Sequence, residues 1–170
     1  MTQKTNKKIL VAVPILAAIL VGSLGLSQAF AENPIKERQP GDILLFKGET
    51  EGWAVFNGEA YPASISIEGK ATLQEDNSWN LVSTSKVDYY SGTAKVFLKG
   101  NANDGKIRLT GTGTSEDGMD LRLILRGNYA PIFEQEDKFA LDWKFAKIDV
   151  PQNGIQILLL QDGIIEIMSN

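Results

Sequence analysis

The 170-residue sequence predicts an all-β domain in which an antiparallel meander closes into a small barrel, with a β-sandwich as the alternative. From about Asp42 onward, apolar and polar residues alternate with a period of two, which is typical of half-buried strands. Short segments rich in Asp, Asn and Gly interrupt this alternation, and no segment offers three turns of an amphipathic helix. We expect eight to ten strands joined by short sequential links, an order that favours closure.

Residues 1–31 have the layout of a signal peptide. Three lysines precede an apolar run over residues 9–26, and small residues follow at Ala29 and Ala31, which predicts cleavage before Glu32. The alternative is an uncleaved membrane anchor, but as a helix the apolar run spans only about 27 Å, just short of a hydrocarbon core of about 30 Å. Either way, we expect an exported protein, extracellular or at the outer face of the cytoplasmic membrane.

A polar linker with two prolines over residues 32–41 precedes a single β domain over residues 42–170. The expected turns lie at Glu75–Asn77, Asn101–Asp104, Glu116–Gly118, Pro151–Gly154 and Asp162–Gly163. The inward phase slips by one residue between Phe145 and Ala146, which suggests a bulge. The apolar residues expected to point inward are Ile65, Ile67, Leu73, Trp79, Leu81, Val96, Leu98, Ile107, Leu109, Met119, Leu121, Leu123, Leu125, Phe139, Leu141, Trp143, Phe145, Ile148, Val150, Ile155 and Ile157.

The hairpin around Glu116–Gly118 has the most strongly specified register. A three-residue turn ending in glycine places Gly113 opposite Leu121 and Gly111 opposite Leu123, so that small residues face large ones on the inner side. Inward glycines also let the strands coil tightly, as barrel corners require.

The composition excludes several classes of function. The chain has no cysteine and no histidine, so thiol chemistry, zinc fingers, Ser-His-Asp triads and histidine metal sites are ruled out, and we expect no cofactor. Without its signal segment the chain keeps 14 Lys and Arg against 21 Asp and Glu, a net charge of −7 that argues against nucleic-acid binding.

No catalytic constellation or metal site is visible. The segment Asn101–Gly105 is similar to the start of a calcium loop, but Thr112 stands where a bidentate glutamate would be needed. The candidates for ligand binding are therefore loop residues where the alternation breaks: Tyr89, Tyr90, Arg126, Asn128 and Tyr129.

Two outer features point to partners. Arg108 and Arg126 are expected to face each other and to repel unless an acid or an anionic partner lies between them. The segment Ile155–Leu160 is apolar on both faces, so it is either covered on both sides or used for self-association through the C-terminal strands. Direct membrane contact is expected only through residues 9–26, if they are not cleaved.

Two stretches, Gly69–Leu81 and Leu125–Ile132, resemble small exported proteins of ammonia-oxidising archaea, a group without an assigned activity. The resemblance implies an archaeal cell-envelope or extracellular setting and carries over no functional residue.

Three functional hypotheses follow. The leading one is an exported, non-catalytic β-domain that binds or scaffolds at the cell surface. The second is a barrel that carries a small apolar ligand in its interior. The third is a carboxylate-dependent hydrolase of extracellular polysaccharide, which would need two carboxylates facing each other across a cleft.

Overall fold

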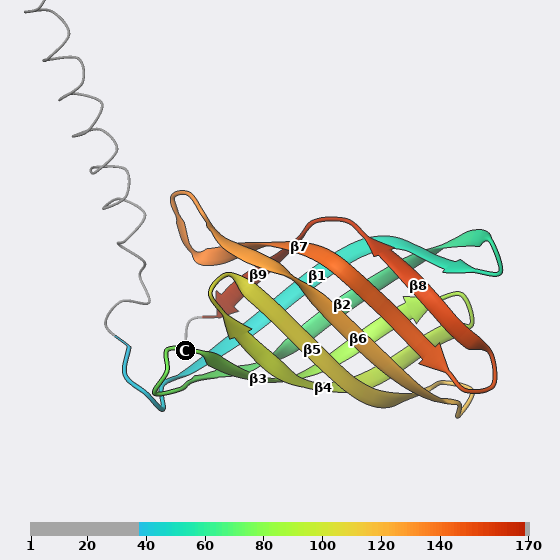
Figure 1. Cartoon of the computed structure of the whole chain (residues 1–170), viewed down its shortest axis with the longest axis horizontal. Coiled ribbons are helices and arrows are strands. Elements are labelled where there is room, and N and C mark those ends of the chain that lie inside the picture. The colour runs from blue at the N-terminus through green and yellow to red at the C-terminus, as the bar shows by residue number, and fades with distance from the viewer. Residues whose placement is uncertain (1–37, 169–170) are drawn as a thin grey trace, which may run out of the picture. The chain divides into compact units, whose positions relative to one another are not determined.

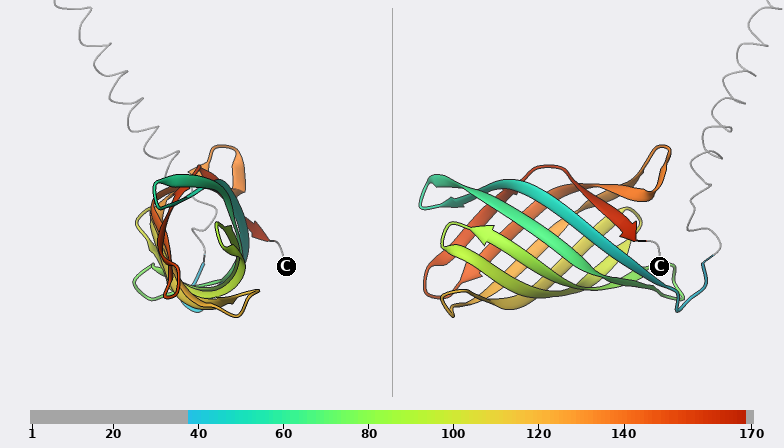
Figure 2. Two further views of the ribbon diagram at one scale, coloured as in Figure 1. Left: turned by 90° about the vertical axis from the view of Figure 1, so that its right-hand side faces the viewer. Right: turned by 180° about the vertical axis from the view of Figure 1, so that it is seen from behind.

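The computed structural model describes residues 38–168, which form a closed antiparallel β-barrel (Figures 1 and 2). The expected signal segment and the first part of the linker lie outside the described residues. Within residues 38–168, no helix is long and apolar enough to cross a membrane. The described strands are β1 (Ile43–Phe56), β2 (Glu59–Leu73), β3 (Trp79–Tyr89), β4 (Gly92–Asn103), β5 (Lys106–Ser115), β6 (Asp120–Ile132), β7 (Gln135–Val150), β8 (Gly154–Leu160) and β9 (Gly163–Met168).

Strands β1 to β7 pair consecutively as antiparallel neighbours, and β8 and β9 together close the sheet. Both lie in the gap between β7 and β1: β8 pairs with the last residues of β7, and β9 pairs with Lys138–Leu141. The barrel therefore has eight strand positions, and the alternative of a sandwich is excluded. The expected reversal at Asp162–Gly163 is wrong, because β8 and β9 run in the same direction and are separated only by a break in the strand.

The stagger of the strands determines the width of the barrel. A path that starts at Leu45 in β1 and steps from each residue to its partner on the next strand goes once around the barrel and comes back to β1 at Val55. The stagger of the barrel is therefore ten residues. An eight-stranded barrel has an interior just wide enough for side chains to fill it or for one small ligand. The trace runs through Leu45, Lys70, Val82, Lys99, Thr110, Ile124, Lys147, Ile157 and Val55.

Side chains fill the middle of this barrel. Leu98, Leu123 and Leu125 have no accessible surface at all, so no water-sized space touches them from the inside or the outside. Trp79 and Trp143 are buried, as their inward phase predicted. The alternation between an apolar inner face and a polar outer face holds through β3, β4, β5 and most of β6.

The register predicted around Glu116–Gly118 is confirmed. Gly113 pairs with Leu121 and Gly111 with Leu123, and Gly118 has the positive φ that the turn requires. A side-chain carbon on Gly111 would lie 1.8 Å from the carbonyl oxygen of Phe97, so only glycine allows β4 and β5 to coil this closely.

Two local predictions near the strand ends need correction. The connection after β4 is the tight turn Asp104–Gly105, both with positive φ, because β4 continues to Asn103. The phase slip in β7 occurs one residue earlier than expected: a bulge lies where Arg126 pairs with Phe145 and Gly127 with Trp143. Phe145 therefore points outward and is exposed, although its spacing placed it in the core.

The register of β8 also differs from the expectation. Val150 pairs with Gly154 and Ile148 with Gln156, so Gln156 and Leu158 point inward. A register shift of one residue moves every side chain of a strand to the opposite face. Ile155 and Ile157, expected in the core, consequently lie on the outside of the barrel.

Candidate binding surface

The binding candidates from the sequence do not form one site. Tyr89 and Tyr90 lie at the end of the barrel that carries the β1–β2, β3–β4, β5–β6 and β7–β8 turns, here called the hairpin end (right in Figure 1). Arg126, Asn128 and Tyr129 lie on β6 toward the opposite end, here called the terminal end because both ends of the described chain are there.

Tyr89 belongs to the interior of the hairpin end. It is buried, its hydroxyl has no hydrogen-bond partner within the described residues, and burial raises its pKa. Gln156 lies in the same interior end and donates from Nε2 to Ser91 Oγ at 3.2 Å, while Asn153 donates to the same oxygen. These groups hold the β3–β4 turn against β8, which is a structural role.

Tyr90 is part of an aromatic cluster at the hairpin end. Its ring lies 5.1 Å from that of Phe56 and 4.3 Å from that of Tyr61. The Tyr61 hydroxyl donates to the carboxylate of Glu59, and this hydrogen bond raises the pKa of Tyr61 to about 12. The contacts tie the β1–β2 hairpin to the β3–β4 turn, so packing accounts for Tyr90.

At the terminal end, the three β6 candidates point to different faces. Tyr129 is half-buried, its ring packs edge-on against Phe139 at 6.0 Å, and burial raises its pKa. Asn128 and Arg126 are exposed on the outer wall. The Arg126 guanidinium lies 5.8 Å from the centre of the Phe145 ring, within the range of a cation–π contact.

The outer wall next to Arg126 carries the most conspicuous surface of the described chain. Five large apolar side chains on β1, β7 and β8, here called the apolar stripe, leave 40 to 56% of their surface exposed: Trp53, Phe145, Ile155, Ile157 and Leu159. Trp53 pairs with Leu159 across β1 and β8. The β7–β8 register, in which Ala146 pairs with Leu158, places Phe145 beside Leu159. Exposed apolar side chains that lie next to one another in this way are typical of interaction surfaces.

The sequence identified only part of the apolar stripe. Its signal in the sequence was the two-faced apolar pattern of Ile155–Leu160. No pattern in the sequence predicted an outward position for Trp53. The spacing of Phe145 predicted an inward position, because the bulge in β7 that turns it outward was expected one residue later.

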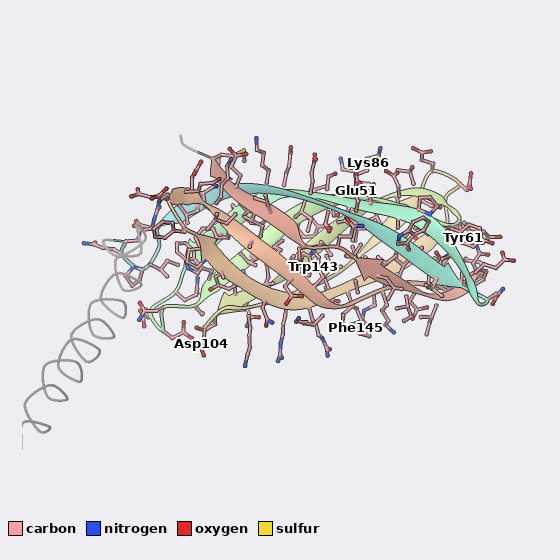
Figure 3. All side chains as sticks on the ribbon, turned by 90° about the horizontal axis from the view of Figure 1, so that it is seen from above. Glu51, Tyr61, Lys86, Asp104, Trp143 and Phe145 are labelled. Carbon is pink, nitrogen blue, oxygen red and sulfur yellow. The ribbon has the colours of Figure 1, made fainter. Side chains whose placement is uncertain are left out.

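Charged residues of both signs flank the apolar stripe. On the β7 side, Lys147 lies next to Ile157 and Asp149 lies next to Ile155, and Arg126 covers Phe145. Glu51 lies on β1, two residues before Trp53. In Figure 3, Glu51 and Phe145 project from opposite sides of the barrel, and Trp143 lies between them in the interior. Among residues 38–168, no ion pair involves Arg126, Lys147 or Glu51.

A hollow of about 370 Å³ lies on the acidic side of the stripe, and Glu51, Trp53, Pro62, Ser64 and Asp88 contribute to its lining. Asp88 accepts hydrogen bonds from Thr93 Oγ1 at 2.6 Å and Ser64 Oγ at 3.0 Å, which lower its pKa. Lys86 Nζ lies 3.7 Å from Asp88 Oδ1, so Asp88 is ion-paired, and Glu51 is the carboxylate of the hollow without an ion-pair partner among the described residues.

A larger hollow of about 640 Å³ lies beside β9, and the charged residues of its lining are Lys47, Glu49, Glu51, Glu68, Lys138, Asp162 and Glu166. In residues 38–168, no group of three or more Asp, Glu, His or Cys side chains is placed to hold a metal ion. Arg108 pairs directly with Arg126 across β5 and β6, as the sequence predicted, and no acid is ion-paired with either in this part of the chain.

Comparison of the chain with protein-family models, with curated proteins and with solved structures finds no match.

Proposed function

We propose that this protein is an exported, non-catalytic β-domain that binds a partner at the cell surface through the outer wall of its barrel. The observation that carries the proposal is the apolar stripe, because a water-soluble barrel wall has no structural need for five adjacent, half-exposed large apolar side chains. The basic start and apolar run at the N-terminus support export.

The interior supports this placement of the binding surface. Leu98, Leu123 and Leu125 leave no space around them in the middle of the barrel. A ligand carrier would instead need a cavity of roughly 300 Å³ or more. Our proposal therefore assigns binding to the wall.

The binding proposal can be tested by hydroxyl-radical footprinting of the full chain on cells that carry it, compared with dilute purified protein. We expect Trp53 and Leu159 to be protected on cells. Phe97, half-exposed on the outer face of β4 and away from the stripe, is the matched control and should be oxidised equally in both samples. Equal oxidation of the stripe in both samples would overturn the proposal.

Export is tested separately by mass spectrometry of protein from the cell exterior. We expect a chain that begins at Glu32. If the chain instead begins at Met1, the signal segment is not cleaved and the protein is anchored in the membrane rather than secreted. Recovery from the cytoplasm alone would contradict export.

A further inference from the structure

We propose that the outer face of β4, β5 and β6 binds an acidic polysaccharide, at a site separate from the apolar stripe. The proposal is carried by five cations with no carboxylate among them, here called the basic wall: Lys99, Lys106, Arg108, Arg122 and Arg126. The inference goes beyond the proposed function, and only the choice of a polysaccharide rests on the proposed export.

Strand register brings the five cations onto one face. β4, β5 and β6 lie side by side (Figure 1), and their outward residues alternate with buried ones. Every outward residue within 97–103, 106–112 and 122–128 is uncharged or basic. The chain from Glu32 carries 14 Lys and Arg against 21 Asp and Glu, so this uniform positive sign is a local feature of an otherwise acidic molecule.

Two of the arginines lie in an unfavourable position. Arg108 is directly opposite Arg126 across β5 and β6, and like charges placed in this way destabilise a sheet. Neither arginine has an ion-pair partner among residues 38–168. An anion bound between the two guanidinium groups would relieve their repulsion and accept hydrogen bonds from both.

Carboxylates border the basic wall without neutralising it. Asp142 is ion-paired with Lys144, and in the described part of the chain no bordering acid forms an ion pair with a cation of the wall. The bordering acids are Asp104, Asp120, Asp142 and Asp149.

Aromatic rings, rather than acids, support two of the cations. Lys99 Nζ lies 5.6 Å from the centre of the Phe97 ring, and the Arg126 guanidinium lies 5.8 Å from that of Phe145. A cation–π contact holds a cation in place but leaves its net charge uncancelled. The wall therefore presents fixed positive charges that lack counter-charges.

The spacing of the cations calls for a ligand with several anionic groups. Arg122 and Arg126 are four residues apart on β6, about 13 Å between their Cα atoms, and Lys99 lies two strands away from β6, about 10 Å. A single sulfate or carboxylate cannot bridge either distance. Asn101 and Thr110 stand between the cations, and their amide and hydroxyl groups can bond to sugar hydroxyls.

Two other anionic partners fit the wall less well. Single-stranded nucleic acids stack their bases on open aromatic rings, but Lys99 and Arg126 already lie over the rings of Phe97 and Phe145. A bilayer takes up protruding apolar side chains, and Ile124, the aliphatic residue of the wall, is half-buried. The proposed export points the same way, because polysaccharides are ordinary components of a cell surface.

The experiment measures binding of the chain from Glu32 to dextran sulfate at about 50 mM salt, with uncharged dextran of the same length as the control. We expect binding to dextran sulfate alone, weakening steeply as salt is added. The Arg108→Gln/Arg126→Gln variant should raise the dissociation constant at least about tenfold. The Lys47→Gln/Lys70→Gln variant removes the same two charges from exposed positions of β1 and β2 and should change it less than about twofold.

Four results would overturn the proposal. These are no binding to dextran sulfate, equal binding to dextran, equal weakening by the two double variants, and tighter binding to oligothymidylate or to phosphatidylglycerol vesicles. Equal weakening would mean that net charge, rather than the basic wall, determines binding. Circular dichroism of each variant checks that the barrel is intact.

Thermal unfolding without ligand gives a second readout. Arg108→Gln removes the repulsion from Arg126, so it should raise the melting temperature by about 1 to 3 °C at low salt, and less at about 0.5 M salt. A lower melting temperature would show that Arg108 supports the fold, which would contradict the unfavourable pairing that the proposal uses.

This proposal and the proposed function can fail separately. Failure to bind dextran sulfate would leave the protection of Trp53 and Leu159 on cells, and with it the proposed function, intact. Equal oxidation of the apolar stripe on and off cells would overturn the proposed function but leave binding by the basic wall standing.

Discussion

Two parts of the barrel wall differ in regularity. From β3 to β6 every strand pairs without a register shift, the inner face is apolar and the outer face is predominantly threonine, lysine and arginine. The closing part, made of β7, β8, β9 and β1, contains the bulge beside Trp143, the break between β8 and β9, and the apolar stripe. The first part is specified by hairpin turns that join neighbours in the sequence, whereas the second must bring the two ends of the chain together.

The comparison separates apolar residues that stabilise the fold from those that do not. In β3 to β6, large apolar side chains are nearly all inside. In the closing part, β8 is apolar on both faces, so Leu158 is buried while its neighbour Leu159 is exposed. The outer apolar residues contribute little to the core, and their presence is better explained by an interaction.

The largest expected effect compares one glycine from each part, Gly111 in β5 and Gly48 in β1, whose nearest neighbours lie at different distances. Gly111→Ala should lower the free energy of unfolding by on the order of 4 kcal/mol, or prevent folding, because its Cβ would overlap the Phe97 carbonyl. Gly48→Ala in β1 should cost about 1 kcal/mol, since its nearest neighbour lies at 3.0 Å. Urea unfolding of both variants measures the difference, and equal costs would contradict the contrast.

The second prediction compares adjacent residues of β8. Leu158→Ala should lower the free energy of unfolding by about 3 kcal/mol, because it leaves a cavity in the core. Leu159→Ala should change it by less than about 0.5 kcal/mol, when measured at a concentration at which the chain is monomeric. A large effect of Leu159→Ala under these conditions would mean that the stripe supports the fold.

The third prediction concerns buried polar groups in the two parts. Ser85 in β3 donates to the Ser66 carbonyl at 2.9 Å, so Ser85→Ala should cost about 1 kcal/mol. Gln156 in β8 is fully buried, and Met at this position would lose the Nε2 hydrogen bond to Ser91 Oγ but would also remove an Oε1 that has no partner within the described residues. Because these two effects offset each other, Gln156→Met should be close to neutral. Thermal unfolding of the pair checks this, and a large loss for Gln156→Met would show that the amide is satisfied.

The smallest expected effect depends on pH. Because hydrogen bonds from Thr93 and Ser64 lower the pKa of Asp88 from its ordinary 3.8, ionised Asp88 stabilises the folded state above that value. This contribution is lost as the pH falls through the lowered pKa. Asp88→Asn should therefore cost less than about 1 kcal/mol at pH 7, since the side chain is partly exposed, and should cost nothing near pH 2. Urea unfolding at pH 7, 5 and 2 measures the trend; a cost that does not diminish in acid would contradict it.

Much of the fold could be predicted from local patterns. Where a tight turn joins two strands with alternating apolar and polar residues, the length of the turn and the need to place the apolar residues of both strands on one face predict the same register. Gly111 opposite Leu123 and Leu73 opposite Trp79 are examples. Where a strand is apolar on both faces, parity carries no information, and the register of β8 was predicted wrongly. The predicted binding site was wrong for a related reason: Tyr89 is the last residue of β3, at the hairpin end, whereas Arg126 lies at the middle of β6 on the outer wall.

By itself, the sequence determined the all-β class, the inward face of β3 to β6 and the absence of cysteine and histidine chemistry, because each depends only on residue type and short-range spacing. Closure, the outward position of Phe145 and Ile157, and the meeting of Trp53 with Leu159 were decided by tertiary structure. Closure and the contact of Trp53 with Leu159 depend on the pairing of β1 with β8, more than 100 residues apart, whose register is set by the stagger of the whole barrel. The outward positions of Phe145 and Ile157 depend on the β6–β7 bulge and on the β7–β8 register, which alternation in a strand apolar on both faces does not specify.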